Sequence, residues 1–242
     1  MDTISASVVE IPADRYWIGD DCRVETSPRH LVTIEESFWV DVRPFTLGLL
    51  EKAVVVGALD SWVDAQPSGE QSVDGLLRRE IDRAEGYAAA QKSMRVTNLQ
   101  DFPVCSVPWE AAALLCEQWG ARLATEAEWE IAMHELSQFS RTAEKSLGWL
   151  RKTLTSESDR GCISCAGACG EWTSSPWSER YFGGSGTTTG PAKDGRVVVR
   201  GRLMSTHIRH AAATNWDETH PTVFRRVWDD PEKVPNFVPV CS

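Results

Sequence analysis

The side chains best suited to chemistry gather near the C-terminal end of the sequence. They combine imidazoles with carboxylates: His207, His210, His220, Asp217 and Glu218. Neutral imidazole binds iron, copper or zinc, and it can carry protons near neutral pH. The spacing His207-x-x-His210 can place two rings on one metal ion at a turn. The alternative is that these are solvated surface residues that flank Trp216.

The same segment also carries residues suited to a binding pocket. Arg209 and Asn215 supply polar groups beside His207, His210 and the indole of Trp216. Ligand pockets combine aromatic walls with a few polar groups that orient the ligand. We therefore expect His207, Arg209, His210, Asn215 and Trp216 to line a pocket.

Three cysteines form a second candidate group. Cys162, Cys165 and Cys169 belong to a chain with 7 cysteines, and thiolates at this spacing can hold a structural zinc ion or another soft metal. The fourth ligand would come from one of the remaining sulfur or imidazole groups: Cys22, Cys105, Cys241 or a histidine. A single CxxC without a second pair is a weak metal signal, and free cysteine also behaves as a small buried hydrophobe. Core filling, metal binding and redox chemistry are therefore all open for this group.

The composition is that of an acidic globular protein. The 242 residues are 42% hydrophobic and 25% charged, and 25 Lys and Arg against 35 Asp and Glu give a net charge of −10. This length predicts one domain, residues 1–242. The negative charge argues against a nucleic-acid partner, and no apolar run is long enough for a membrane span. We expect a small molecule or a protein as partner, with no nucleic acid and no membrane.

Two further features bear on the compartment and the core. The lack of a secretory pattern after Met1 favours the cytoplasm, where reducing conditions argue against a disulfide framework for the 7 cysteines. Eleven tryptophans indicate a loop-rich core with aromatic packing.

The elements expected in the first half of the chain are short. Alternating apolar residues predict strands over 11–19, 29–35 and 38–42, and Thr46 is the predicted N-cap of a helix that ends near Val56. The composition of 58–96 differs from that of the flanking segments, and we interpret this stretch as an insertion or exposed arm. Within it, 73–90 has helical spacing and a charged, solvated face.

Two helices and two strands are expected to lead to the candidate site. One helix covers 110–119 and ends at Gly120, and the other begins after Thr125 with a capping box that ends at Glu128. Strands are predicted over 196–200 and 222–228. They place the pocket residues on the loops between them.

Several separated segments match the motifs of one family in the right order. PVCSVPWEAA at 103–112 resembles P-V-x-x-V-x-W-x-x-A, and GARLATEAEWE at 120–130 resembles G-x-R-L-P-T-E-A-E-W-E. Shorter matches complete the series: WIG at 17–19, PRH at 28–30, GEWT at 170–173, VRG at 199–201, IRHAA at 208–212 and FR at 224–225. Together they resemble the sulfatase-modifying-factor domain, also called the formylglycine-generating-enzyme domain, over about residues 11–228.

The resemblance implies a fold and a chemistry. The fold is a mixed α+β, C-type-lectin-like arrangement with short strands, two main helices and long irregular loops. Members with formylglycine-generating activity oxidise a target cysteine with oxygen, using a copper-binding cysteine pair shortly after the R-G-G-S strand. Paired thiolates suit Cu(I). Here residues 201–210 read GRLMSTHIRH and contain no cysteine, so that mechanism cannot be carried over.

Other metal sites of the family are also weakened. The related iron-dependent sulfoxide synthases take their histidines largely from an additional N-terminal helical domain, and only His30 and His134 precede residue 200 here. The Asn of G-N-V-W-E-W, which helps to bind calcium in some members, aligns with Ala168. Calcium needs six to eight oxygen ligands, so this site is doubtful.

Two functions are therefore weighed. The first is a non-catalytic accessory protein that binds a ligand or partner through the C-terminal loop surface. The second is a metal-dependent oxidoreductase acting on a small molecule or peptide, with iron or copper held by His207 and His210 or by the Cys162, Cys165 and Cys169 group.

Overall fold

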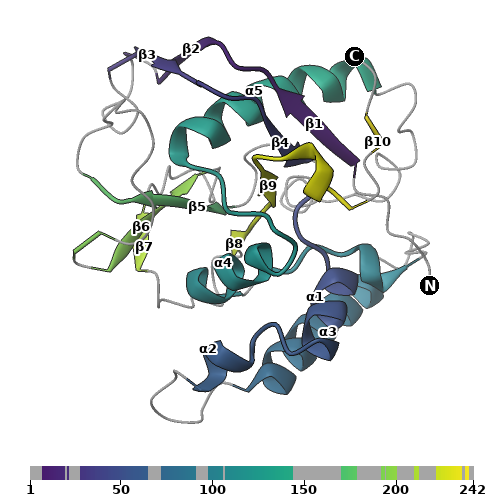
Figure 1. Ribbon diagram of the computed structural model, residues 1–242. Helices are drawn as coiled ribbons and strands as arrows, with labels where there is room; N and C mark the ends of the chain where they lie inside the picture. Colours follow the sequence, from purple (N-terminus) through teal and green to yellow (C-terminus); the bar gives the residue numbers. More distant parts are fainter. Residues whose placement is uncertain are drawn as a thin grey trace.

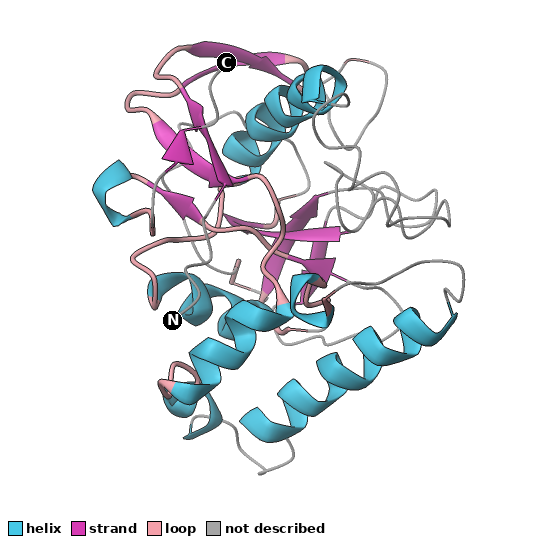
Figure 2. Ribbon diagram, turned by 90° about the vertical axis from the view of Figure 1, so that its right-hand side faces the viewer, coloured by secondary structure: helices cyan, strands magenta, loops and turns pink. Residues whose placement is uncertain are grey.

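The computed structural model describes residues 7–19, 21, 28–64, 72–90, 98–105, 107–143, 170–178, 192–193, 195–200, 210–212, 222–235 and 238–239. These residues form three small sheets and a set of helices, a mixed α+β arrangement (Figure 1). In two perpendicular views α5 lies on the upper side of the molecule and α1 to α3 on the lower side, with most strands between them (Figures 1 and 2).

The first sheet joins the two ends of the described chain. β1 (Ser7–Ile11) pairs antiparallel with β4 (Phe38–Asp41). β9 (Val227–Trp228) extends the sheet beyond β4, and β10 (Val238–Pro239) pairs parallel with β1 on the other side. The N-terminal and C-terminal segments therefore depend on each other for backbone pairing.

The second and third sheets lie closer to the candidate site. β2 (Arg15–Ile18) and β3 (His30–Thr33) form a two-stranded antiparallel sheet. The third sheet has the order β7-β6-β5-β8. Its strands are β5 (Gly170–Pro176), β6 (Arg196–Arg200), β7 (His210–Ala212) and β8 (Thr222–Val223).

The α-helices of the described chain all lie before residue 144. They are α1 (Leu47–Val55), α2 (Asp60–Asp64), α3 (Val73–Ala90), α4 (Trp109–Glu117) and α5 (Glu126–Ala143), with short 3₁₀ turns η2 (Leu99–Asp101) and η3 (Pro231–Lys233). Among these, no helix is long and apolar enough to cross a membrane.

Local signals at the helix ends are confirmed. After α4 the chain turns at Gly120, whose φ of 64° is open to glycine without a steric penalty. At the start of α5 the Glu128 backbone N–H donates to Thr125 Oγ1 at 3.3 Å, and the Thr125 N–H donates to Glu128 Oε2 at 2.8 Å. These two bonds are the predicted capping box.

Two hydrophobic cores hold the elements together. The larger one packs α1, α3 and α4 against the third sheet and includes Leu50, Leu115, Trp172, Phe224 and Trp228. The smaller one packs the apolar side of α5 against β2, β3 and β4. The motif tryptophan Trp172 is a core residue whose N–H group is bonded: its Nε1 donates to the Val107 carbonyl at 2.9 Å.

The exposed-arm interpretation of 58–96 is wrong. Leu76, Glu80 and Ala84 recur every four residues along α3 and are 0%, 3% and 3% exposed. This face packs against α1 and η2, and the backbone N–H of Cys105 donates to Glu80 Oε2 at 3.0 Å. The charged face of α3 is solvated as predicted, with Arg78 and Asp82 exposed, but the apolar residues spaced by four pack the opposite face into the core. That the segment is an insertion stays a prediction.

The single strand predicted over 222–228 is also wrong. It divides into β8 and β9, which belong to different sheets. Between them the Phe224 carbonyl accepts a hydrogen bond from the Phe45 N–H at 2.8 Å, and both Arg225 and Arg226 are buried. Arg225 and Arg226 pair with carboxylates of two different strands, Glu171 of β5 and Asp41 of β4, so this stretch has protein packed around it on more than one side.

Candidate functional site

The structure describes only part of the candidate pocket. His210 is the first residue of β7 and pairs with Val198 of β6. The remaining predicted ligands and pocket residues lie outside the described part of the chain: His207, Arg209, Asn215, Trp216, Asp217, Glu218, His220, Cys162, Cys165 and Cys169. Their grouping therefore stays a prediction.

The strands that border the pocket segments are well defined. β6 ends at Arg200 and β7 begins at His210, so 201–209 joins two neighbouring antiparallel strands. β7 and β8 lie at opposite edges of the same sheet, and 213–221 joins them. At the far end the Thr222 N–H donates to the Cys105 carbonyl at 2.8 Å. Both segments thus start and finish on one sheet.

Arg200 anchors the end of β6 to α5. Its Nη2 lies 2.5 Å from Glu130 Oε2, and its Nη1 lies 3.3 Å from Glu126 Oε1. The other oxygen of Glu130 accepts a hydrogen bond from the Gly19 N–H at 2.6 Å. The guanidinium carbon lies 5.3 Å from the ring centroid of Trp129. Arg200 thereby connects the end of β6, where 201–209 begins, to α5. Through Glu130 it is also linked to Gly19, which follows β2.

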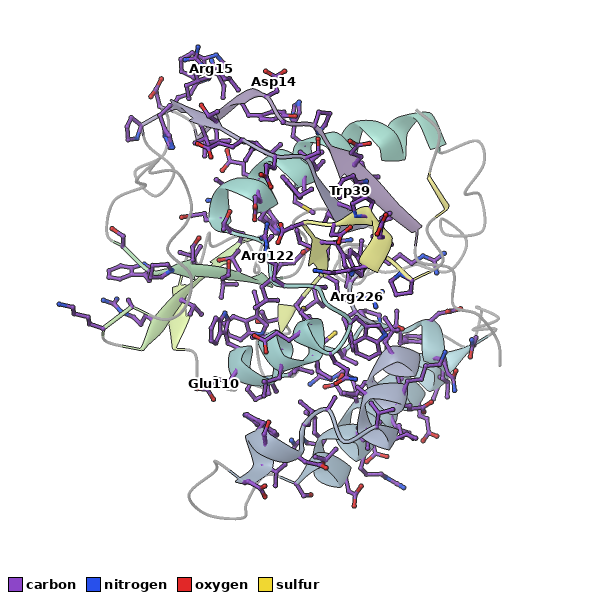
Figure 3. All side chains as sticks on the ribbon, viewed as in Figure 1. Asp14, Arg15, Trp39, Glu110, Arg122 and Arg226 are labelled. Atoms are coloured by element: carbon purple, nitrogen blue, oxygen red, sulfur yellow. The ribbon has the colours of Figure 1, made fainter. Side chains whose placement is uncertain are left out.

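Arg122 makes a second polar junction, between the start of α5 and the C-terminal sheet strand β9. Its guanidinium bonds both oxygens of Glu128 at 2.7 Å and lies 2.6 Å from Asp229 Oδ1. The Arg122 side chain is partly buried, with 30% of its surface exposed, and Figure 3 shows it near the middle of the view. Burial lowers the pKa of Arg122, but the hydrogen bonds that its guanidinium donates to Glu128 and Asp229 outweigh burial and hold the pKa above its usual value. The guanidinium is permanently charged.

The adjacent arginines Arg225 and Arg226 each meet one buried carboxylate. Arg225 Nε lies 3.0 Å from Glu171 Oε2, and both side chains are at most 3% exposed. Arg225 also donates to the carbonyl of Val42. Arg226 Nε lies 2.8 Å from Asp41 Oδ2. These pairs connect β4 and β5 to the chain between β8 and β9.

Arg226 is also surrounded by aromatic rings. Its guanidinium carbon lies 4.8 Å from the ring centroid of Trp228, 5.6 Å from that of Trp119 and 5.8 Å from that of Phe45. Burial raises the pKa of its partner Asp41, and the guanidinium of Arg226 offsets part of that rise. Such a site stabilises a charge by cation–π contact and ion pairing together.

These contacts give the motif residues a structural task. Glu128, Glu171, Arg200 and Arg225 all carry family-like motifs, and each is held by an opposite charge inside the fold. Catalytic acids or bases need an open face toward a substrate. The described members of the motifs act as a framework that holds the sheets and α5 in place.

Metal donors are not grouped in the described part of the chain. No three His, Cys, Asp or Glu side chains there are placed to hold an ion. Cys105 and Cys116 are buried, and neither forms a disulfide. Cys105, considered above as a zinc ligand, has its Sγ 3.4 Å from the Pro103 carbonyl. Burial raises the pKa of Cys116, which keeps its thiol protonated.

Sequence analysis did not predict the links between Arg226 and Asp41 or between Arg200 and Glu130. One signal was available for the first link. Arg225 and Arg226 follow two apolar residues in a segment rich in core types, and buried guanidinium groups need carboxylate partners. Arg226 and its partner Asp41 are 185 residues apart along the chain, so no local sequence pattern indicates that they pair.

A family model decides the relationship of the chain to known proteins. The sulfatase-modifying factor enzyme 1-like domain matches residues 3–142, more than half of the sequence. The chain belongs to this family. No curated protein sequence matches it. The resemblance inferred from the motifs is therefore confirmed.

A solved structure extends the comparison to the C-terminal part. The structure of PvdO from Pseudomonas aeruginosa matches with a TM-score of 0.50 and 16% identity, over 91% of this chain and 93% of that one. At this identity the likeness concerns the fold alone. The family member described here has the mixed α+β, C-type-lectin-like fold of formylglycine-generating enzymes, as the resemblance implied.

The copper centre of the catalytic family members does not fit this chain. That centre needs two thiolates shortly after the strand that here is β6, and 201–210 supplies imidazole, guanidinium, hydroxyl and thioether groups but no thiol. Cu(I) selects soft sulfur ligands in pairs, and the single thioether of Met204 does not replace them. No step through a copper–thiolate group is therefore derived.

Proposed function

We propose that this sulfatase-modifying-factor-like protein is a non-catalytic accessory protein that binds a small molecule or a protein partner. The binding surface is the C-terminal loop surface carried by 201–221, with His207, Arg209, His210, Asn215 and Trp216 as its recognition residues. Function resides in such loops, while the fold provides a rigid base.

The observation that carries this proposal is a contrast between framework and chemistry. Glu128, Glu171, Arg200 and Arg225 keep the family motifs and are used in internal ion pairs. The cysteine pair that the family's oxidation requires is replaced in 201–210. A chain that keeps the ion pairs of the framework but lacks the cysteine pair needed for oxidation is suited to binding.

The main competing function is a metal-dependent oxidoreductase with a non-standard site. It is supported by the placement of His210 at the start of β7, one strand away from Arg200, with His207 three residues earlier. Iron or copper would be its metal, whereas zinc on the Cys162, Cys165 and Cys169 group would be a structural clip.

Metal analysis of the purified chain separates these functions. The unmodified protein is compared with a His207→Ala/His210→Ala variant and with a Cys162→Ser/Cys165→Ser variant. The proposal expects no stoichiometric iron or copper in any of them. Stoichiometric iron or copper that is lost in the histidine variant would overturn it. Zinc lost only in the cysteine variant would identify a structural site and leave the binding function standing.

A second experiment tests the missing thiols directly. A sulfatase-type peptide with its target cysteine is incubated with the protein, copper and oxygen, and mass spectrometry follows the conversion of cysteine to formylglycine. We expect no conversion. Conversion above a protein-free control would contradict a non-catalytic function and would show that residues other than a cysteine pair support the oxidation.

The cytoplasm is the compartment proposed for this activity. Cys105 and Cys116 are buried and form no disulfide, and reduced thiols are typical of cytosolic proteins. Fractionation of cells that express the chain at its natural level, followed by immunoblotting, tests this placement.

A further inference from the structure

A tryptophan of the two-stranded sheet is exposed in an unusual setting. Trp17 lies in the middle of β2 and is 61% exposed. On the outer face of the sheet it lies opposite Leu31 of β3 and two residues from Arg15. Arg29 lies over its ring, with the guanidinium carbon 5.1 Å from the centroid. We call Arg15, Trp17, Arg29 and Leu31 the Trp17 face.

The two guanidinium groups of this face, those of Arg15 and Arg29, have no ion-pair partner among the described residues. The charged carboxylates of Asp14 and Asp21 lie nearby and accept from backbone N–H groups, that of Arg15 at 2.7 Å and that of Arg29 at 2.9 Å, but neither is within ion-pair distance of a guanidinium group. Figure 3 shows Arg15 and Asp14 at the outer edge of the molecule, away from Arg122 and Arg226.

This arrangement contrasts with the arginines inside the fold. Arg122, Arg200, Arg225 and Arg226 are each neutralised by at least one carboxylate within the described chain. The inner side of the same two-stranded sheet is packed, since Ile18 and Val32 are 3% exposed. An exposed indole flanked by two arginines that form no ion pair within the described chain is therefore confined to the outer face.

We propose that the Trp17 face is a docking surface for an acidic segment of a partner protein that also carries an aliphatic side chain. Carboxylates would pair with Arg15 and Arg29, and the aliphatic group would cover Trp17 and Leu31. Tryptophan and arginine are the residue types most enriched at the energetic centres of protein interfaces. The surface lies outside 201–221, so it does not depend on the proposed binding function there.

Other occupants fit the charges less well. A second copy of this chain in a symmetric dimer would bring the same face to the same face, and four guanidinium groups would then meet. A nucleic acid would meet two arginines on a chain whose net charge is −10, which repels a phosphate backbone at longer range. An acidic peptide segment carries few charges and needs only the local pair.

The test follows the indole N–H resonance of Trp17 in the full-length chain. The protein is labelled with ¹⁵N-tryptophan, and a Trp17→Phe variant assigns the signal. The probe is an acetylated peptide, Glu-Leu-Glu-Leu-Glu-Glu, and the matched control peptide has Lys in place of each Glu. We expect a saturable shift of the Trp17 signal with the acidic peptide alone, weakened by added salt because exposed charges are screened.

Variants of the arginines make the test specific. Arg15→Gln/Arg29→Gln should weaken peptide binding about tenfold or more, which corresponds to the loss of about 1.4 kcal/mol. Arg78→Gln changes an arginine of α3 whose side chain is 75% exposed, and it should bind as the unmodified chain does. The other indole signals report whether each variant keeps its fold.

Three results would overturn the proposal. The first is the absence of a saturable Trp17 shift with the acidic peptide. The second is an equal shift with the lysine peptide or an equal affinity of the Arg15→Gln/Arg29→Gln variant. The third is a Trp17 shift that follows protein concentration without peptide, which would assign the face to contact between copies of the chain.

Discussion

At the scale of the residue, the ion pairs inside the fold show what the motif positions do. Arg225 and Glu171 are buried together, and the guanidinium of Arg225 also bonds backbone carbonyls of β4 and the following turn. A buried charge is costly unless it is paired and hydrogen-bonded. Replacing either Arg225 or Glu171 alone is therefore expected to lower the free energy of unfolding.

Glu171→Gln tests this structural task. The substitution leaves the Arg225 guanidinium buried without its counter-charge, so we expect the free energy of unfolding to fall by about 3–5 kcal/mol. Urea unfolding followed by circular dichroism measures it. The control is Asp82→Asn, which breaks the exposed pair with Arg78 on α3 and should cost less than about 0.5 kcal/mol. Equal losses in the two variants would contradict a structural role for Glu171.

Cys116 predicts a pH dependence of stability. Burial raises the pKa of this thiol above its ordinary value of 9.0. Above that pH the thiol of the unfolded chain ionises while the folded one stays protonated, so the folded state loses stability as pH rises. Between about pH 8 and about pH 10 the unmodified chain should lose more stability than Cys116→Ala, measured by urea unfolding at each pH. Parallel losses in the two proteins would show that the thiol is not linked to folding.

At the scale of the element, α3 shows how a segment of charged composition becomes part of the core. Its buried residues are spaced by four, so they form one stripe along a helix that packs on α1. In the middle of this stripe Glu80 binds the backbone of Cys105, whose carbonyl in turn binds the start of β8. The segment read as an arm thus supports the strand that follows the candidate pocket.

Leu76→Ala tests the packing of α3. Leu76 is fully buried in the larger core, so its truncation leaves a cavity and should lower the free energy of unfolding by about 2–5 kcal/mol. Arg78→Ala, two residues away on the exposed side, is the matched control and should change it by less than about 0.5 kcal/mol. Urea unfolding of both variants makes the comparison. A small effect of Leu76→Ala would restore the exposed-arm interpretation.

At the scale of the whole molecule, the described elements interlock across the sequence. β9 and β10 complete the sheet begun by β1 and β4. Trp228 and Phe224 lie in the same core as Leu50 and Leu115. Although the family model matches residues 3–142, the material that completes both the sheet and the core comes from beyond that region.

A truncated chain of residues 1–143 tests this interdependence. It contains the matched region but lacks β5 to β10, so we expect it to lack stable tertiary structure. Near-ultraviolet circular dichroism and the dispersion of its amide resonances measure this, with the full-length chain as the reference. A cooperative thermal transition in the truncated chain would contradict a single interdependent domain.

The sequence by itself determined the local features and the family. The capping box at Thr125 and Glu128, the turn at Gly120 and the helix before it follow from interactions over a few residues, and the structure confirms them. The ordered motifs were sufficient for the family, and through it for the fold class. Of the candidate site, the sequence identified the border strand β6 and the absence of the thiol pair.

Only the tertiary structure decided which partners these residues meet. The pairing of Arg226 with Asp41, of Arg200 with Glu130 and of Cys105 with Glu80 joins residues far apart in the chain. Each pair depends on how strands and helices dock, which is set by the burial of apolar surface from many elements at once. For the same reason the residues 222–228, which resemble one strand in sequence, form two strands in two sheets, with the buried Arg225 and Arg226 between them.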